Sequence, residues 1–173
     1  MKMRSRWFAL LTALMALIGA SSTRIEARQV RSWPNWAIEG DPHIQATRAF
    51  QYLLRARSYK IAADGVFGRQ TESALKNFQS AHGLDAHGIV DSTVWKKIVI
   101  QVRRGSRGEA VRAMQVLLRS KGYPVRVDGV FGAATDKIVR RYQRANGLIG
   151  DGVVGRDTWC ELFDGDVKRV SEE

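Results

Sequence analysis

Apolar side chains recur at helical spacing in one stretch of the chain, and the same pattern returns further along. In the first copy the residues with this spacing are Ala46, Ala49, Phe50, Leu53 and Leu54, and in the second they are Ala110, Val111, Met114, Leu117 and Leu118. Apolar residues three and four positions apart are typical of an amphipathic helix with one buried face. The pattern therefore predicts a helix in each copy, ending near Tyr59 and near Tyr123.

A second and a third helix are predicted to follow in each copy. The apolar face of the second helix is Ala74, Leu75, Phe78 and Ala81, matched by Ile138, Val139, Tyr142 and Ala145. This helix should end where Gly83 or Gly147 can adopt the left-handed conformation of a C-cap. Asp91 and Gly155 are the expected N-caps of a short third helix that carries a tryptophan. Each copy is thus predicted to be a three-helix unit with two glycine loops.

An identical pentapeptide connects the first two predicted helices of each copy. Its sequence is Asp-Gly-Val-Phe-Gly, at residues 64–68 and again at 128–132, and the same offset aligns the flanking residues without a gap. The Asp carboxylate can accept hydrogen bonds from backbone N–H groups just ahead of it, and the first glycine can take positive φ. The Val and Phe are expected to turn inward as an apolar plug, and the last glycine to cap the next helix. The pentapeptide is therefore first a structural loop, with a direct ligand role as the alternative.

Two glutamines lie inside the apolar pattern of the first predicted helix of each copy. Gln51 and Gln115 occupy the same register, each three residues before the last leucine of the helical stripe. We expect both side chains to hydrogen-bond neighbouring backbone, since an amide that is carried into a core needs partners there.

The N-terminal residues are predicted to be a targeting segment rather than part of the fold. Basic residues within the first six positions precede an apolar run over 7–20 that is too short for a comfortable membrane span. We predict a signal peptide within 1–27, with cleavage after Ala20, Ser22 or Ala27, and an uncleaved anchor as the alternative. A secreted, extracellular or cell-wall-associated protein follows, with no stable membrane insertion after cleavage.

The formal net charge is +11, of which +3 belongs to the leader up to Ala20, and the basic residues of the remaining chain are spread over both copies. In an exported protein this excess points to acidic polymers such as cell-wall carboxylates and phosphates, or to anionic lipid head groups. Nucleic acid is disfavoured by the leader, and the alternative is that the charge only maintains solubility.

Cys160 has no partner for an intramolecular disulfide. Because its counterpart in the first copy is Lys96, a residue type that is rarely buried, Cys160 is expected on or near the surface, with a buried inert thiol as the alternative.

The predicted organisation is all-α: two tandem small three-helix domains after a cleavable signal peptide. A lead-in segment over 28–40 carries Trp33 and Trp36, which either pack on the first copy or stack on sugar rings. The first copy spans 41–101, the second 102–163, and a polar tail 164–173.

The spaced glycines and aromatics of both copies resemble the peptidoglycan-binding domain family, small three-helix modules of bacterial cell-wall proteins. The residues that carry the resemblance run from Leu53-Leu54 through the pentapeptide to Gly83-Leu84, and recur in the second copy as far as Thr158-Trp159. The first copy departs from the pattern in having His87 where the second has Asp151. If only one copy binds, the resemblance favours the second.

No catalytic or metal-binding constellation stands out, and no cofactor is predicted. The histidines are not matched between copies, and no nucleophile motif or phosphate-binding loop is found. The predicted function is therefore an exported non-catalytic protein that binds peptidoglycan or an associated anionic cell-wall polymer through two repeats. The alternative is a protein-interaction or targeting subunit for a cell-wall hydrolase or another exported partner.

The predicted ligand contacts lie on the glycine loops, where an aromatic face and cationic groups can meet a sugar or a stem peptide. In the first copy they are Tyr59, Lys60, Asp64, Phe67 and Arg69, and in the second they are Tyr123, Arg126, Asp128, Phe131 and Arg156. The second set converges only if the two glycine loops of that copy lie side by side. The alternative is that the aromatic rings are core and the Asp residues only close turns.

Overall fold

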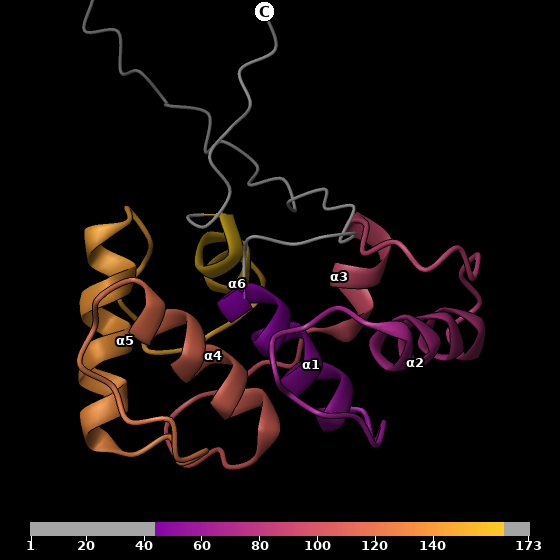
Figure 1. Ribbon diagram of the computed structural model, residues 1–173. Coiled ribbons are helices and arrows are strands. Elements are labelled where there is room, and N and C mark those ends of the chain that lie inside the picture. The colour runs from indigo at the N-terminus through magenta and orange to yellow at the C-terminus, as the bar shows by residue number, and fades with distance from the viewer. Residues whose placement is uncertain (1–43, 165–173) are drawn as a thin grey trace, which may run out of the picture. The chain divides into compact units, whose positions relative to one another are not determined.

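The computed structural model describes residues 44–164, all of which belong to one compact unit of the chain (Figure 1). This range contains six helices and no strand: α1 (Ile44–Ala56), α2 (Arg69–Ala81), α3 (Ser92–Ile98), α4 (Glu109–Ser120), α5 (Ala133–Ala145) and α6 (Arg156–Asp164). The prediction of an all-α fold built from two tandem three-helix copies is confirmed. None of these helices is both long enough and apolar enough to cross a membrane.

Several predictions fall on residues outside this range. They are the signal peptide over 1–27, the lead-in segment over 28–40 with Trp33 and Trp36, the first positions of the first copy, and the tail beyond residue 164.

The helix ends follow the local signals in the sequence. The Asp91 carboxylate caps α3 by accepting hydrogen bonds from the backbone N–H groups of Thr93 and Val94, both at 2.9 Å. After α2 and α5 the chain turns through Gly83 and Gly147, whose φ angles are 65° and 68°. These positive angles let the chain leave the helix while the last carbonyls remain hydrogen-bonded. The predicted caps are confirmed at these three positions.

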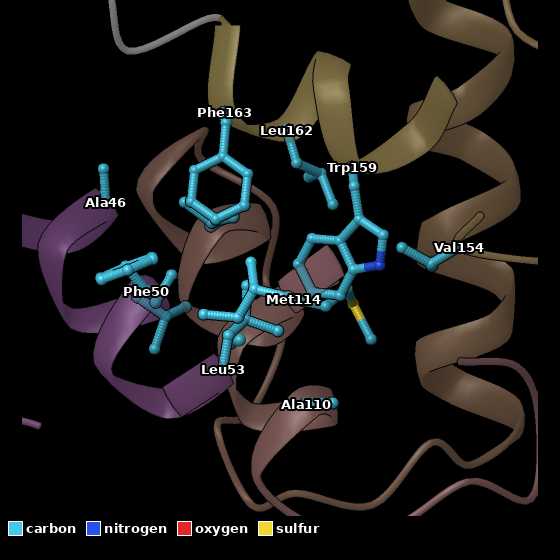
Figure 2. Close-up of a cluster of buried hydrophobic side chains, with 14 of the residues drawn as sticks. Ala46, Phe50, Leu53, Ala110, Met114, Val154, Trp159, Leu162 and Phe163 are labelled. Atoms are coloured by element: carbon cyan, nitrogen blue, oxygen red, sulfur yellow. The ribbon is translucent and has the colours of Figure 1, made fainter. Parts of the chain in front are cut away.

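One hydrophobic core runs through both copies. Helices α1 and α4 pack against each other, and α6 packs along α4. Figure 2 shows Phe163 of α6 reaching down between α1 and α4, beside Trp159. The Phe163 ring lies 4.3 Å from the Trp95 ring of the first copy and 5.9 Å from the Trp159 ring, centroid to centroid. Because all three side chains are 0 % exposed, each copy completes the core of the other.

The connection between the copies is attached to both of them. The Arg57 guanidinium donates hydrogen bonds to the carbonyls of Lys97, Ile98 and Val99 at 2.6, 3.2 and 3.2 Å. The Trp159 indole N–H donates to the carbonyl of Ile100 at 2.9 Å. These bonds fix the C-terminal end of α3 and the segment after it, so the two copies are held without a flexible linker.

A second set of contacts continues along the connection. Val102 and Val154 exchange a pair of backbone hydrogen bonds at 3.3 and 2.8 Å. The Arg55 guanidinium forms a 3.0 Å ion pair with the Glu109 carboxylate, across the contact between α1 and α4. The pair is partly exposed, so it orients the two helices more than it stabilises them.

The prediction that Cys160 lies on or near the surface is wrong, because its side chain is 2 % exposed. Lys96 of α3, its register equivalent, is exposed as expected. The two positions differ because α6 packs along α4, whereas α3 makes no equally extensive contact with another described helix. Equal register therefore does not mean equal surroundings.

The expected apolar faces of α2 and α5 also need a correction. Ala81 and Ala145 are exposed, while Gln79 and Gln143 are buried at 0 % and 1 % exposure. Buried positions on a helix recur at alternating steps of three and four residues, and Gln79 lies four residues after the buried Leu75. The glutamines therefore continue the buried stripe, whereas the alanines fall outside it. The amides are inside the fold and require hydrogen-bond partners.

Candidate ligand-binding loops

The loop after α1 is closed by the side chain of Gln51, which is 1 % exposed. Its Oε1 accepts a hydrogen bond from the Gly65 N–H at 2.8 Å. Its Nε2 lies within donating distance of Asp64 Oδ1, the Val66 carbonyl and Thr71 Oγ1, at 2.9, 3.0 and 3.0 Å. Asp64 Oδ1 also accepts from the Val66 N–H at 2.9 Å. One buried amide therefore holds the whole turn in a single conformation.

The second copy repeats the bonds to the glycine, the aspartate and the valine carbonyl. Gln115 Oε1 accepts from the Gly129 N–H at 2.8 Å, and Gln115 Nε2 donates to Asp128 Oδ1 and the Val130 carbonyl at 2.9 and 3.2 Å. The expectation that both glutamines hydrogen-bond neighbouring backbone is confirmed. The same bonds also engage the aspartates of the pentapeptide.

The loop after α5 is built in the same way, although its sequence differs from the pentapeptide. Gln143 Oε1 accepts from the Gly152 N–H at 2.9 Å. Gln143 Nε2 lies within donating distance of Asp151 Oδ1, the Val153 carbonyl and Thr158 Oγ1, at 3.0, 2.9 and 3.2 Å. The second copy thus contains two glutamine-closed loops rather than one.

The loop after α2 is the variant of this design, because His87 stands where the other three loops have an aspartate. Gln79 Oε1 accepts from the Gly88 N–H at 3.0 Å, and Gln79 Nε2 donates to the Ile89 carbonyl at 3.0 Å. His87 Nδ1 faces Gln79 Nε2 at 3.2 Å and the Ile89 N–H at 3.0 Å. Since both neighbours are donors, Nδ1 acts as an acceptor and the ring hydrogen is assigned to Nε2, 3.6 Å from Asp91 Oδ2.

A basic side chain three residues before each glutamine covers the loop. These side chains are Arg48, Lys76, Arg112 and Arg140. Arg48 donates to the Asp64 carbonyl at 3.1 Å, and Arg140 donates to the Gly150 carbonyl at 3.0 Å. In the loop after α2 the Lys76 side chain lies against the glycine, since a Cβ on Gly88 would lie 2.9 Å from Lys76 Cε, an atom that can move aside. Gly88 has a φ of 76°, and this backbone conformation is the reason that glycine is required here.

The pentapeptide aspartates are ionised parts of these networks. The pKa of Asp64 is lowered, first by the hydrogen bond from the Val66 N–H and then by the one from Gln51. The pKa of Asp128 is lowered by the corresponding bonds from Val130 and Gln115. Hydrogen bonds to a carboxylate favour its charged form. At neutral pH both groups therefore accept hydrogen bonds and hold no proton to donate.

The aromatic residues predicted to contact ligand face the protein to different degrees. Phe131 is 1 % exposed and belongs to the core. Phe67 is half-buried and stacks on Phe50, with ring centroids 6.4 Å apart. Tyr59 and Tyr123 are half-buried, each with its ring edge-to-face against the second helix of its copy. Of the four predicted aromatics, only the tyrosines and Phe67 keep part of their surface available to a ligand.

The prediction that the Val of the pentapeptide turns inward is wrong for Val66, whose side chain is 65 % exposed. Phe67, the next residue, does pack against the core. Successive side chains of a chain that is not helical tend to point to opposite sides. One of the two therefore faces solvent when the other faces the core.

The charged residues predicted as ligand contacts are all exposed. They are Lys60, Asp64, Arg69, Arg126, Asp128 and Arg156. In the second copy the loop that contains Arg126 is closed by Gln115 of α4, whereas the loop before Arg156 is closed by Gln143 of α5. Each loop is thus positioned by its own helix. The convergence of Arg126 and Arg156 on one ligand stays a prediction.

The sequence pattern contained a signal for the second pair of loops that the repeat comparison missed. The sequence basic-x-x-Gln begins at Arg48, Lys76, Arg112 and Arg140, and each of its glutamines is followed by an x-Gly-aliphatic turn. Aligning only the long repeat hides this shorter repetition within each copy.

The sequence matches the model of one protein family twice. The family is described as a putative peptidoglycan binding domain, and the matches cover residues 45–98 and 107–162, together more than half of the chain. The two matches coincide with the two three-helix copies of the structure.

Similar proteins include two cell-wall enzymes. The chain is 30 % identical over 164 residues to the N-acetylmuramoyl-L-alanine amidase CwlL of Bacillus licheniformis, a match that covers 83 % of this chain and 44 % of the amidase. It is 44 % identical over 64 residues to the zinc D-Ala-D-Ala carboxypeptidase of Streptomyces albus G, covering 34 % of this chain and 24 % of the carboxypeptidase. The chain thus spans less than half the length of either relative.

A solved structure with sequence similarity to this chain is the peptidoglycan-binding protein of Clostridioides difficile in complex with glutamine hydroxamate. It is 35 % identical, the match covers 39 % of this chain and 43 % of that one, and the TM-score is 0.39. On the strength of the two family matches, this chain belongs to the peptidoglycan-binding domain family, of which it carries two tandem copies.

Proposed function

We propose that this chain is an exported, non-catalytic protein that binds bacterial cell-wall peptidoglycan through both of its domain copies. The observation that carries the proposal is the double family match, which coincides with two copies joined in a single core. A family of binding modules supplies the ligand class. The basic character of the chain suits the acidic groups of a cell wall.

The loops offer contacts of the kind that a sugar or stem peptide needs. Tyr59 and Tyr123 present partly exposed rings, and Lys60 and Arg126 are exposed cations close to them in the chain. An aromatic ring packs on apolar sugar or methyl surface, and a guanidinium or ammonium group pairs with carboxylates. The buried glutamines fix the loops, so little conformational entropy is lost when a ligand binds.

Two such surfaces on one compact unit would strengthen attachment to a polymeric wall. After one copy binds, the other is held near further ligand at a high effective concentration. Weak sites then suffice for retention. Because the connection is fixed through Arg57 and Trp159, the spacing between the surfaces is constant.

The direct test is co-sedimentation of the pure protein with insoluble peptidoglycan sacculi at low salt. We expect most of the protein in the pellet and no release of soluble muropeptides from the sacculi. Protein that stays in the supernatant would refute binding, and release of muropeptides by the pure, metal-supplied protein would refute the non-catalytic part.

A second candidate function is that of a targeting subunit which holds a cell-wall hydrolase. It is favoured by the relatives, an amidase and a carboxypeptidase that both extend well beyond the matched region. Affinity purification from the producing cells would test it. A hydrolase recovered in stoichiometric amount, from a protein that does not sediment with sacculi, would favour this function over direct binding.

A further inference from the structure

The outer face of α5 carries a stripe of positive charge. Lys137, Arg141 and Arg144 are exposed and follow one another at helical spacing. They lie away from the buried face of the helix, which includes Val139 and Tyr142. None of the three takes part in an ion pair within residues 44–164. We call these three residues the α5 stripe.

The corresponding face of the first copy is uncharged. In the register of the repeat, the α5 stripe corresponds to Ser73, Asn77 and Ser80 of α2, which are also exposed. Each of the two helices is the second of its copy, and each has 13 residues. Since α2 forms with neutral residues at these positions, the helix does not need the stripe.

The stripe is also unfavourable for the helix itself. Like charges at positions three and four residues apart repel one another across a helical turn. The acidic groups nearby are already engaged: Asp136 pairs with Arg140 at 3.0 Å, and the Asp151 carboxylate accepts from Gln143. Within the described part of the chain, no carboxylate forms an ion pair with the stripe.

The arrangement of the stripe indicates the shape of its partner. From residue 137 to residue 144 the helix rises about 10 Å, so the charges form a line rather than a pocket. No aromatic side chain belongs to the line, which argues against stacking on a single sugar. A row of cations with steps of about 6 and 4.5 Å along the helix axis suits a linear chain that carries one negative charge in each short repeat unit.

We propose that the α5 stripe binds a linear phosphodiester polymer attached to the cell wall, and that the first copy lacks this activity. This inference rests on the proposed function, because it adds a second ligand class to a protein that already lies on peptidoglycan. The carboxylates of stem peptides fit the stripe less well, since they stand on short branches rather than along a continuous chain. The α5 stripe thereby gives the second copy a role that the first copy does not have.

The repeat supplies a matched variant for the test. The triple variant K137S/R141N/R144S places in α5 the residues that α2 carries in the same register, so the fold should tolerate it. The reciprocal variant S73K/N77R/S80R builds the stripe on α2. A combination of both moves the stripe and leaves the net charge unchanged. Neutralising Lys96, Lys97 and Arg119 to Gln removes as many exposed charges elsewhere and serves as the control.

The probe is purified poly(glycerol phosphate), with affinity measured by calorimetry as a function of salt. We expect the α5 triple variant to bind about tenfold more weakly at low salt than the unmodified protein, since each exposed ion pair contributes little alone. The reciprocal variant should bind more tightly, and the control variant should change little. If the control variant and the α5 triple variant lose the same affinity for the polymer, the effect depends only on net charge and the proposal is overturned.

Sacculi separate this inference from the proposed function. On sacculi that keep their phosphodiester polymer, the α5 triple variant should be retained less than the unmodified protein. On sacculi stripped of that polymer, the two should be retained equally. Equal retention on both preparations overturns the role of the stripe alone. If the α5 triple variant is also retained less on stripped sacculi, the stripe binds peptidoglycan itself, and the phosphodiester assignment is likewise overturned. If none of the proteins sediments with either preparation, the proposed function is refuted.

Discussion

Replacing Gln143 by Glu tests whether the buried amides hold the loops in the way the hydrogen bonds indicate. Glu has nearly the same shape, and its oxygen can still accept from the Gly152 N–H. It has no hydrogen to donate to the Val153 carbonyl or to Asp151 Oδ1, which Gln143 reaches at 2.9 and 3.0 Å. The variant also sets a carboxylate against the carboxylate of Asp151.

The expected loss of stability at pH 7.5 is about 3 kcal/mol. Two lost hydrogen bonds account for roughly 2 kcal/mol, at about 1 kcal/mol each. The like-charge contact in a partly exposed site adds on the order of 1 kcal/mol. A change of this size lowers the melting temperature of a domain this long by about 10 °C.

The matched control is Gln79→Glu in the first copy. There the residue opposite the amide is His87, whose Nδ1 lies 3.2 Å from Gln79 Nε2. No carboxylate stands opposite the new one there, so no like charges meet. Only the two hydrogen bonds donated by the amide, to His87 Nδ1 and to the Ile89 carbonyl, are lost. The loss should therefore be about 2 kcal/mol, smaller than at Gln143.

The two variants should also differ in their pH dependence. Burial and the Asp151 carboxylate raise the folded-state pKa of a Glu at position 143 above its unfolded value. The variant is therefore least disadvantaged below about pH 4, where the new group is protonated in both states. The loss of unfolding free energy caused by Gln143→Glu grows as the pH rises from the unfolded pKa to the folded pKa, and it reaches its full value above the folded pKa.

Urea unfolding followed by tryptophan fluorescence measures this difference, with the unmodified protein as the reference at each pH. The reasoning would be refuted if the two variants lost equal free energy of unfolding at pH 7.5. It would also be refuted if the difference in stability between Gln143→Glu and the unmodified protein did not become smaller in acid.

Three further predictions concern stability. Phe163→Ala should lower the free energy of unfolding by about 3–5 kcal/mol and leave one calorimetric transition, because its ring completes a shared core. Two transitions would mean that the copies fold independently. Ser58→Gly should raise the free energy of unfolding by about 1 kcal/mol, measured as a higher urea midpoint, since Ser58 has a φ of 72° where the second copy has Gly122. An unchanged midpoint would mean that the serine is not strained. Because the pKa values of Asp64 and Asp128 are lowered, the stabilisation that their carboxylates provide is present above about pH 4 and is lost as the pH falls through the folded pKa values. The double variant Asp64→Asn/Asp128→Asn should therefore lose less free energy of unfolding on acidification than the unmodified protein. An equal loss in the two proteins would contradict this.

The local structure of this chain could be predicted because its signals are short-range. Helical spacing, the Asp91 cap and the left-handed Gly83 each depend on a few neighbouring residues. Where the prediction failed, the outcome depends on packing between distant segments. Cys160 is buried because α6 packs along α4, and no residue near Cys160 in the chain carries that information.

The candidate site shows the same limit. The pentapeptide was expected to close a turn, and it does, but the long repeat did not indicate that Gln79 and Gln143 close two more turns of the same kind. Nor can spacing alone decide whether Arg126 and Arg156 meet. Their loops are near each other in sequence, yet each is closed against a different helix, so their separation depends on how those helices pack.

The distribution of polar residues between the copies separates what the fold needs from what a ligand can use. The polar residues that repeat, such as Gln51 and Asp64 with their counterparts, are engaged by hydrogen bonds inside the loops. Where the copies differ, the fold accepts either residue. Two such differences are the α5 stripe and His87, one on an outer helix face and the other within a loop. We therefore expect the two copies to share one scaffold and one mode of loop closure but to differ in ligand preference.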